Sequence, residues 1–223
     1  RRAAGIIHEE AGRMARLVED LLDLARIESG QVVMHKTPLD LAQILSSTMD
    51  RLLPQAAKKQ IKIIKQWDSL PPVVGDGDRL AQVFTNFLDN AVRYTPDGGR
   101  ITIAGQIVKG LPRPRRSRTG QIRPDAATTA SARGDFVSVS ITDTGPGIPP
   151  EELARIFERF YQVDKSRKRG RGAGLGLAIT KEIVEAHGGY VRAESVESVG
   201  TKFTVLLPIT EADALTVISR RAR

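Results

Sequence analysis

Between Ile7 and Gly30 the apolar side chains recur at alternating steps of three and four residues. This spacing keeps them on one face of a helix and is typical of a helix packed in a bundle. A stripe this wide needs a partner helix, so we expect residues 1–30 to be half of a helical hairpin that self-associates. The face comprises Met14, Leu17, Leu21 and Leu24, widened by Val18, Leu22 and Ile27.

Two further helices and a strand are predicted in the next part of the chain. Asp40 is placed to cap a helix that runs through Leu53, and Pro54 is expected to end it. Residues 61–67 form a strand-like run. A helix is then predicted over residues 78–94, with a core face made of Leu80, Phe84, Phe87, Leu88 and Ala91.

The second half of the chain alternates between strand patterns and irregular segments. A strand begins at residues 101–103, and another covers 136–141. Between them, residues 109–134 lose all periodicity and are rich in proline and arginine, so we expect disorder there. The last strand pair is predicted at 190–195 and 200–207, with a weakly patterned tail after it.

Composition narrows the classes of function. The chain has 223 residues, no cysteine and a formal net charge of +8. Without cysteine, a disulfide framework and a thiolate metal site are excluded. Residues 105–135 hold seven Lys or Arg against two Asp, and residues 165–171 hold five with no acid, so the rest of the chain is slightly acidic. The charge is therefore confined to one loop and one further segment, which disfavours a broad nucleic-acid surface.

No apolar run approaches the roughly 20 residues that span a bilayer. The chain begins at Arg1 inside a predicted helix. We therefore expect a piece of a longer protein.

Residues 170–187 contain a glycine-rich run that leads into an apolar helix. Glycines occupy every second position from 170 to 176 and let a ligand approach the main chain closely. A helix N-terminus presents free N–H groups that suit a phosphate. The spacing matches neither a P-loop nor a dinucleotide-binding fingerprint, so another kind of nucleotide lid or a simple flexible linker remains.

Asn86 and Asn90 are four residues apart on the helix predicted over 78–94, so they lie on one face. Asparagine is a poor residue inside a helix. A carboxamide oxygen is a hard ligand for Mg²⁺, and its NH₂ group can donate to phosphate. The pair is therefore either a metal and phosphate face or two solvated side chains.

Asp143 ends a predicted strand and is followed by Gly145 and Gly147. A carboxylate there can accept a hydrogen bond from an exocyclic amine, while the glycine backbone contacts a flat ring. Alone, this pattern is also common in turns. A short helix is predicted over residues 151–157, and aromatic residues follow at 157–161.

In this order, these segments resemble the ATP-binding catalytic domain of sensor histidine kinases, within the wider group of gyrase, heat-shock chaperone, histidine kinase and mismatch-repair ATPases. The matching boxes are the N box at 86–95, the first glycine box at 143–148, the phenylalanine box at 157–161, the second glycine box at 172–177 and a last glycine element at 200–201.

The resemblance covers about residues 60–208 and implies an α+β two-layer sandwich, with a mixed, mostly antiparallel sheet packed on about three helices. A connector and first helix over 31–59 would precede it, and residues 209–223 would form a tail. The basic segment at 105–135 stands where the family usually has a short hairpin turn.

The resemblance also implies roles for individual residues. Asp143 would accept from the adenine amine, and Asn90 would ligate Mg²⁺, with Asn86 as a second candidate ligand. Arg93 would contact phosphate. The remaining residues would line the pocket or close over the phosphates: Tyr94, Gly145, Gly147, Ile148, Phe160, Tyr161, Lys165, Ser166, Arg167, Gly172, Gly174, Leu175, Gly176, Leu177 and Thr201.

The segment at residues 13–30 is similar to the second helix of the family's dimerisation and phosphoacceptor hairpin. His8 lacks the proline-containing box of the phosphoacceptor, and His35 and His187 have no such context either. The resemblance therefore implies a homodimer whose phosphoacceptor histidine is absent from this fragment. It further implies a response-regulator partner, Mg-ATP as the bound nucleotide and a cytoplasmic location, as the cytoplasmic part of an inner-membrane sensor.

Gln82 stands where the hydrolysing members of the group carry a glutamate that activates water. A carboxamide cannot act as a general base, so a kinase is favoured over an ATPase clamp. A non-catalytic docking module that has lost its nucleotide is the third alternative.

Overall fold

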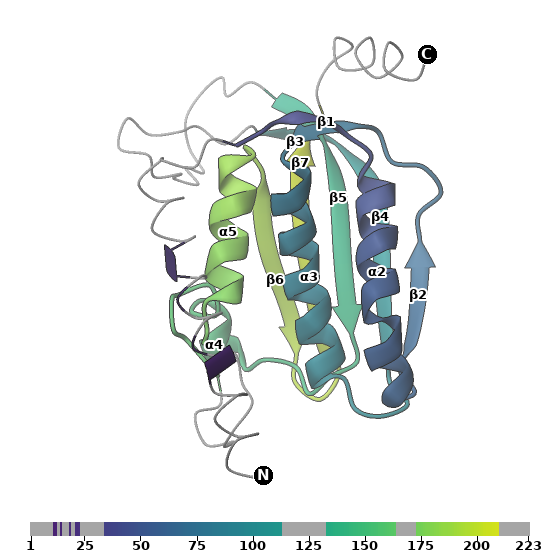
Figure 1. Cartoon of the computed structure of the whole chain (residues 1–223), viewed down its shortest axis with the longest axis vertical. Helices are drawn as coiled ribbons and strands as arrows, with labels where there is room; N and C mark the ends of the chain where they lie inside the picture. The colour runs from purple at the N-terminus through teal and green to yellow at the C-terminus, as the bar shows by residue number, and fades with distance from the viewer. Residues whose placement is uncertain are drawn as a thin grey trace.

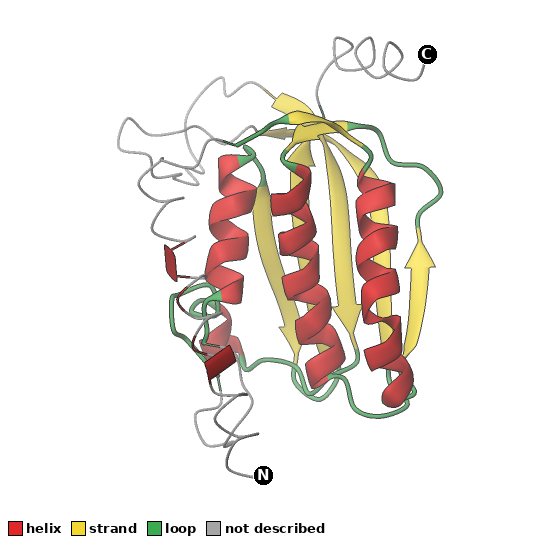
Figure 2. Ribbon diagram, viewed as in Figure 1, coloured by secondary structure: helices red, strands yellow, loops and turns green. Residues whose placement is uncertain are grey.

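The computed structural model describes residues 34–112, 133–163 and 173–209, together with Ala11, Gly12, Met14, Val18, Leu21 and Leu22. Within these residues the chain forms a two-layer α/β sandwich, in which helices α2 (Leu41–Lys58), α3 (Gly77–Tyr94) and α5 (Gly176–Ala186) lie side by side on one face of a five-stranded sheet (Figure 1). All three helices stand in front of the strands in the same view (Figure 2).

The sheet has the strand order β2-β4-β5-β7-β6. Its strands are β2 (Lys62–Gln66), β4 (Arg100–Pro112), β5 (Arg133–Asp143), β6 (Tyr190–Val196) and β7 (Gly200–Pro208). β2 pairs with β4 in parallel, and the other neighbours are antiparallel. The predicted mixed, mostly antiparallel sheet on three helices is therefore confirmed.

A second, two-stranded sheet joins β1 (Thr37–Leu39) to β3 (Val73–Gly75). It lies beyond the ends of the helices (Figure 1). This small sheet attaches the segment before α2 to the start of α3.

The core lies between the helices and the sheet, and it follows the periodicity of the sequence. All five residues expected on the core face of α3 are buried, as are the inward-facing residues of β4, β5 and β7. In the middle of this layer, the ring of Phe87 from α3 stacks on that of Phe203 from β7, with centroids 4.8 Å apart. The core thus fixes α3 against β7.

Helix α2 begins where the sequence predicts but does not end there. Asp40 caps it by accepting from the N–H groups of Ala42 and Gln43, as expected. The prediction that Pro54 ends the helix is wrong, because Pro54 lies inside it. Its ring is exposed, so the backbone bond that proline removes is lost on the solvent side, while Leu52 and Ala56 keep the core stripe buried.

The boundaries of the basic segment also differ from the prediction. Residues expected to be irregular from 109 onward continue β4 to Pro112, and β5 already starts at Arg133. The ladder between the two strands passes an irregularity between Val108 and Leu111, then resumes with Leu111 opposite Gly134. Backbone pairing needs no apolar alternation, which explains why the sequence pattern missed this extension. Residues 113–132, where disorder was predicted, lie outside the described residues.

Two other expectations concern helices. The helix predicted over 151–157 is shorter, since α4 covers only Pro150–Leu153 and gives way to turns. Of the predicted N-terminal helix, the six described residues are helical. Met14, Val18 and Leu22 are exposed, whereas Leu21 packs against the core. None of the helices among the described residues has the length and apolar character needed to cross a membrane.

Candidate nucleotide-binding site

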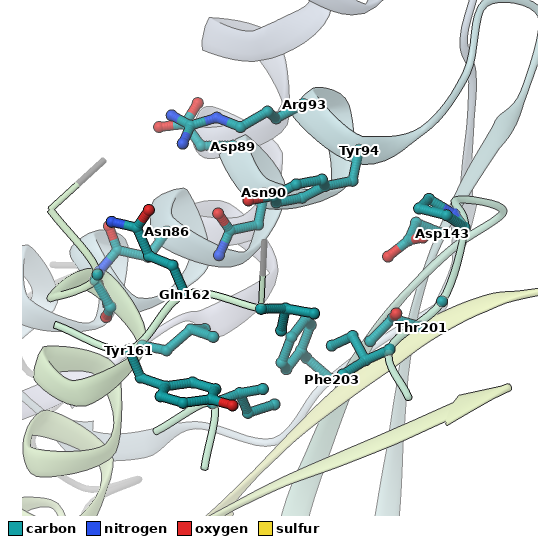
Figure 3. A pocket seen from close by; sticks show the side chains of 18 of the residues that line it. Asn86, Asp89, Asn90, Arg93, Tyr94, Asp143, Tyr161, Gln162, Thr201 and Phe203 are labelled. Atoms are coloured by element: carbon teal, nitrogen blue, oxygen red, sulfur yellow. Dashed lines mark hydrogen bonds between the residues drawn. The ribbon is translucent and has the colours of Figure 1, made fainter. Parts of the chain in front are cut away.

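A pocket of about 440 Å³ opens at the end of the sheet where α3 ends and α5 begins. Its walls come from α3, the segment after β5, the aromatic turn after α4, the start of α5 and the beginning of β7 (Figure 3). Of the predicted site residues, the structure brings together here Asn86, Asn90, Arg93, Tyr94, Asp143, Gly147, Ile148, Tyr161, Gly174, Gly176, Leu177 and Thr201.

Helix α3 supplies one wall. Asp76 caps the start of α3 by accepting from the N–H group of Arg79. The apolar residues of α3 are buried against the sheet. Asn86 and Asn90 therefore lie along the pocket side of the helix (Figure 3). Asn86 Nδ2 donates to the carbonyl of Gly176 (3.1 Å) and to Thr180 Oγ1 (3.3 Å) on α5. This amide thus joins α3 to α5, and its oxygen is the part that a metal could use.

Asp143 lies at the opposite end of the pocket from Asn86 (Figure 3). Its side chain is buried, and Oδ1 accepts from the N–H group of Gly145 at 2.8 Å. Burial raises the pKa of Asp143 above its usual value, while hydrogen bonds from the backbone of Gly145 and Thr201 oppose the rise. A buried carboxylate with one oxygen held by the main chain is pre-oriented to accept a hydrogen bond from a ligand.

The two glycines after Asp143 lie at positions that are packed too closely for a side chain. Gly147 has φ +74°, and a Cβ there would lie 2.3 Å from the carbonyl oxygen of Val196. The N–H group of Ile148 donates to Ser195 Oγ, and that of Ser198 donates to the carbonyl of Pro146. These contacts fix the segment against the β6–β7 turn. Gly145 does not line the pocket itself but holds Asp143.

The aromatic turn contributes Tyr161 but not Phe160. Tyr161 lines the pocket, and the Arg155 guanidinium lies 4.2 Å from its ring centroid. Phe160 has φ +60°, donates its N–H group to the carbonyl of Gly174, and has a side chain that is 57% exposed. This backbone conformation turns the ring to solvent, so Phe160 is not among the lining residues.

The start of α5 provides the glycine wall. Gly174 has φ +74° and packs on the backbone of Phe160, and Gly176 lies against Asn86. Leu175, which was predicted to bind ATP, is buried in the core instead. The predicted lid residues Lys165, Ser166, Arg167 and Gly172 lie outside the described residues.

Several lining residues were missed by the sequence reasoning: Asp89, Pro146, Ile156, Gln162, Val163, Ala173 and Phe203. The sequence could have indicated Asp89, because it lies four residues before Arg93 and therefore on the same helix face. Burial raises the pKa of Asp89, and the positive charges of Arg93 and Arg51 oppose the rise. The others are apolar or uncharged, and only the tertiary fold places them here.

The described residues contain no group of three or more His, Asp or Glu that could hold a metal ion. Mg²⁺ commonly binds through one or two protein oxygens, with phosphates and waters completing its shell. The carboxamides of Asn86 and Asn90 fit that mode.

Comparison with known proteins agrees with this geometry. A family profile described as histidine kinase-, DNA gyrase B-, and HSP90-like ATPase matches residues 75–211. The sensor histidine kinase WalK of Bacillus subtilis is 32% identical over 208 residues, which cover 92% of this chain and 30% of WalK. The sensor histidine kinase CusS of Escherichia coli K12 is 36% identical over 201 residues, 90% of this chain and 36% of CusS.

Solved structures give the same result. Full-length ShkA in complex with AMPPNP is 30% identical, has a TM-score of 0.71, and is matched over 95% of this chain and 39% of its own. The catalytic domain of the histidine kinase ThkA is 26% identical with a TM-score of 0.59, over 79% of this chain and 97% of that domain. The chain thus spans nearly all of an isolated catalytic domain but well under half of the curated relatives.

Proposed function

The chain belongs to the histidine kinase-, DNA gyrase B-, and HSP90-like ATPase family, as an ATP-binding catalytic domain of the sensor histidine kinase type, and we propose that it positions Mg-ATP for transfer of the γ-phosphate to a histidine. That histidine would belong to the phosphoacceptor helix of the parent protein. The phosphate would then pass to an aspartate of a response regulator.

The observation that carries this proposal is the pairing of Asp143 with the asparagine face of α3 across one pocket. Asp143 can accept from the exocyclic amine of adenine, because one of its oxygens is already held by Gly145. Asn90 and Arg93 lie on α3 across the same pocket. The pocket therefore offers an acceptor for a purine and donors and ligands for a polyphosphate.

Mg²⁺ would be held by Asn90 Oδ1, with Asn86 Oδ1 as a second candidate ligand. When bound, the ion neutralises phosphate charge. Arg93 would contact phosphate directly, and the main chain of Gly174 and Gly176, with the predicted lid residues, would close over it. Phosphoryl transfer depends mainly on such positioning and charge stabilisation.

In the sequence, Gln82 favours a kinase over an ATPase, because a carboxamide cannot take a proton from water. The structure does not strengthen this inference, since Gln82 does not line the pocket and its Oε1 accepts from Arg79 Nη1 at 3.1 Å. The choice of a kinase therefore rests on the relatives, which are sensor histidine kinases.

The proposed partners follow from the same assignment. The helix at residues 1–30 would form a homodimer through its apolar stripe, of which Met14, Val18 and Leu22 are exposed. A receiver domain would dock to accept the phosphate. Since ATP and receiver domains are cytoplasmic, we propose a cytoplasmic location for this part of the parent protein.

The proposal is tested by calorimetric titration with a non-hydrolysable ATP analogue, with and without Mg²⁺. We expect micromolar-range binding that strengthens with Mg²⁺. Asn90→Ala should still bind the base of the nucleotide. The gain in affinity that Mg²⁺ gives should be smaller than in the wild type by roughly tenfold or more, because a metal ligand is removed.

The matched control is Gln43→Ala, which also removes a carboxamide. Gln43 is exposed on α2 and is not a lining residue of the pocket. Gln43→Ala should therefore bind as the wild type does, with full Mg²⁺ dependence. No binding by the wild type at millimolar analogue would refute the assignment and favour a docking module.

A further inference from the structure

Lys59, the residue after α2, reaches the far end of another helix. Its ammonium donates to the carbonyl oxygens of Val92 (2.8 Å), Arg93 (3.2 Å) and Thr95. All three acceptors belong to the C-terminal end of α3. An ammonium has three donors, so this single side chain can commit every one of them to the same helix end.

The end of α3 needs such a donor. Helices often stop at a left-handed glycine, whose N–H group satisfies the last carbonyls. Here the C-cap is Thr95, with φ −65° and ψ 129°, because the following Pro96 favours an extended residue before it. The N–H group of Thr95 donates to the carbonyl of Ala91, one turn earlier, and so leaves the later carbonyls to other donors.

Water competes only in part for these carbonyls, because the bonds to Val92 and Thr95 are partly buried and only the bond to Arg93 is exposed. Thr95 is fully buried, and its hydroxyl has no hydrogen-bond partner within the described part of the chain. The partly buried carbonyls beside Thr95 are less accessible to water and therefore rely more on protein donors. The positive charge of Lys59 also complements the negative end of the helix dipole.

The main chain of Lys59 holds the same region from the other side. Its carbonyl accepts from the N–H group of Gly98 at 2.9 Å, and the N–H group of Lys62 donates to the carbonyl of Gly99 at 2.9 Å. Lys59 is therefore tied through both backbone and side chain to the segment in which α3 ends.

The restrained turn is the one that faces the nucleotide pocket. Arg93 and Tyr94 both line the pocket. On its other side this turn lies close to Gly145, since a Cβ on Gly145 would lie 3.1 Å from the carbonyl oxygen of Tyr94. The N–H group of Gly145 in turn donates to Asp143. The last turn of α3 thus lies between Lys59 and the segment that carries Asp143.

We propose that Lys59 is a positioning residue for the nucleotide, which sets the last turn of α3 so that Arg93, Tyr94 and Asp143 keep their spacing around the ligand. This inference rests on the proposed function. Lys59 does not line the pocket and acts through the turn that it caps.

The experiment is titration of the full chain with a non-hydrolysable ATP analogue and Mg²⁺, for Lys59→Met, Lys59→Arg and the control Lys58→Met. A misplacement of about 1 Å can cost about a hundredfold in the chemical step, and we expect Lys59→Met to bind the analogue at least about tenfold more weakly. Lys59→Arg, which keeps charge and donors, should recover part of that loss. Lys58 is exposed in the last turn of α2, and Lys58→Met should bind as the wild type does.

A general loss of structure is distinguished from a positioning role by repeating the titration in a chain that already carries Arg93→Ala and Tyr94→Ala. If Lys59 acts through this turn, adding Lys59→Met there should cost less affinity than it costs in the wild type, because only the effect through Asp143 remains; an undiminished loss would overturn the proposal. If Lys59→Met does not stay folded, Lys59→Gln, with two donors on a shorter stem, takes its place with the same expected direction.

The outcomes distinguish the two proposals. Wild-type binding together with unchanged binding by Lys59→Met would overturn the role of Lys59 and leave the proposed function intact. No wild-type binding would overturn both.

Discussion

At the scale of single residues, the carboxylate of Asp143 costs folding stability, and its proposed use is in nucleotide binding. Its carboxylate is buried, and burial raises its pKa. A raised carboxyl pKa means that the folded state prefers the protonated form, so the charged group opposes folding as pH rises above the usual value near 3.8. A charged residue that lowers stability in a pocket is best explained by a ligand that needs its charge.

Asp143→Asn should therefore separate binding from stability. Asparagine can still accept from Gly145 through its oxygen, but its NH₂ group would then meet the adenine amine, donor against donor. We expect a loss of about 1.5–3 kcal/mol in nucleotide binding, roughly 10- to 150-fold, measured by calorimetry. The melting temperature at pH 7 should be unchanged or higher, since a buried charge is removed. Unchanged affinity would contradict the assigned role.

At the scale of elements, His187 joins three segments at the end of the domain away from the pocket. It follows α5, and its Nδ1 lies 2.7 Å from the carbonyl of Ile183. Its Nε2 accepts from the N–H group of Asp76, before α3. Lys36, before β1, donates to the carbonyl of Ala186 in the same corner. The imidazole must therefore be neutral, with its hydrogen on Nδ1.

This corner should make stability depend on pH. Burial, together with the charge of Lys36, lowers the pKa of His187, although the bond to Ile183 and the charge of Asp76 oppose this. Between the lowered folded value and the usual 6.5 the unfolded chain binds more protons. Stability should thus be lost as pH falls below about 6.5, with a slope of at most about 1.4 kcal/mol per pH unit from this group.

Chemical denaturation of the wild type and His187→Gln between pH 5 and 8 measures this slope, since glutamine cannot titrate there. The difference between the two proteins should shrink as the pH falls. Parallel curves for the wild type and His187→Gln would rule out this contribution.

At the scale of the whole molecule, the pocket is assembled from segments that are far apart in the chain. Its residues run from Asn86 to Phe203, and contacts such as Asn86 to Thr180 join α3 to α5 over 94 positions. The pocket therefore needs the folded domain, whereas the proposed acceptor histidine belongs to a separate helix.

Incubation with γ-labelled ATP should consequently leave no acid-labile phosphate, the mark of a phosphorylated histidine, on this chain. Addition of the parent protein's phosphoacceptor hairpin should place label on the hairpin, because the nucleophile is then supplied. His8→Ala should label the hairpin as efficiently as the unsubstituted chain does. Acid-labile label on this chain alone, lost in His8→Ala, would show that His8 is an acceptor after all. Steady phosphate release that ignores the hairpin would instead favour an ATPase.

Local patterns in the sequence determined the elements and most of the core. The α3 stripe was predictable because helical spacing alone puts Leu80, Phe84 and Phe87 on one side, and the same spacing puts Asn86 and Asn90 on another. Asp40 was readable as a cap because capping is a contact between near neighbours. The order of the glycine and asparagine boxes was enough to indicate the family and the fold.

Only the tertiary structure decided which distant side chains meet. Pro54 was misjudged because a helix tolerates proline where the broken bond faces solvent, and exposure is set by packing. Leu175 and Phe160 sit within the expected boxes, yet one points into the core and the other to solvent. Phe203 and Lys59 carry no local signal, since stacking on Phe87 and capping of α3 arise from contacts between separate elements. Periodicity fixes which side of an element a residue occupies, whereas its partner depends on how the elements pack.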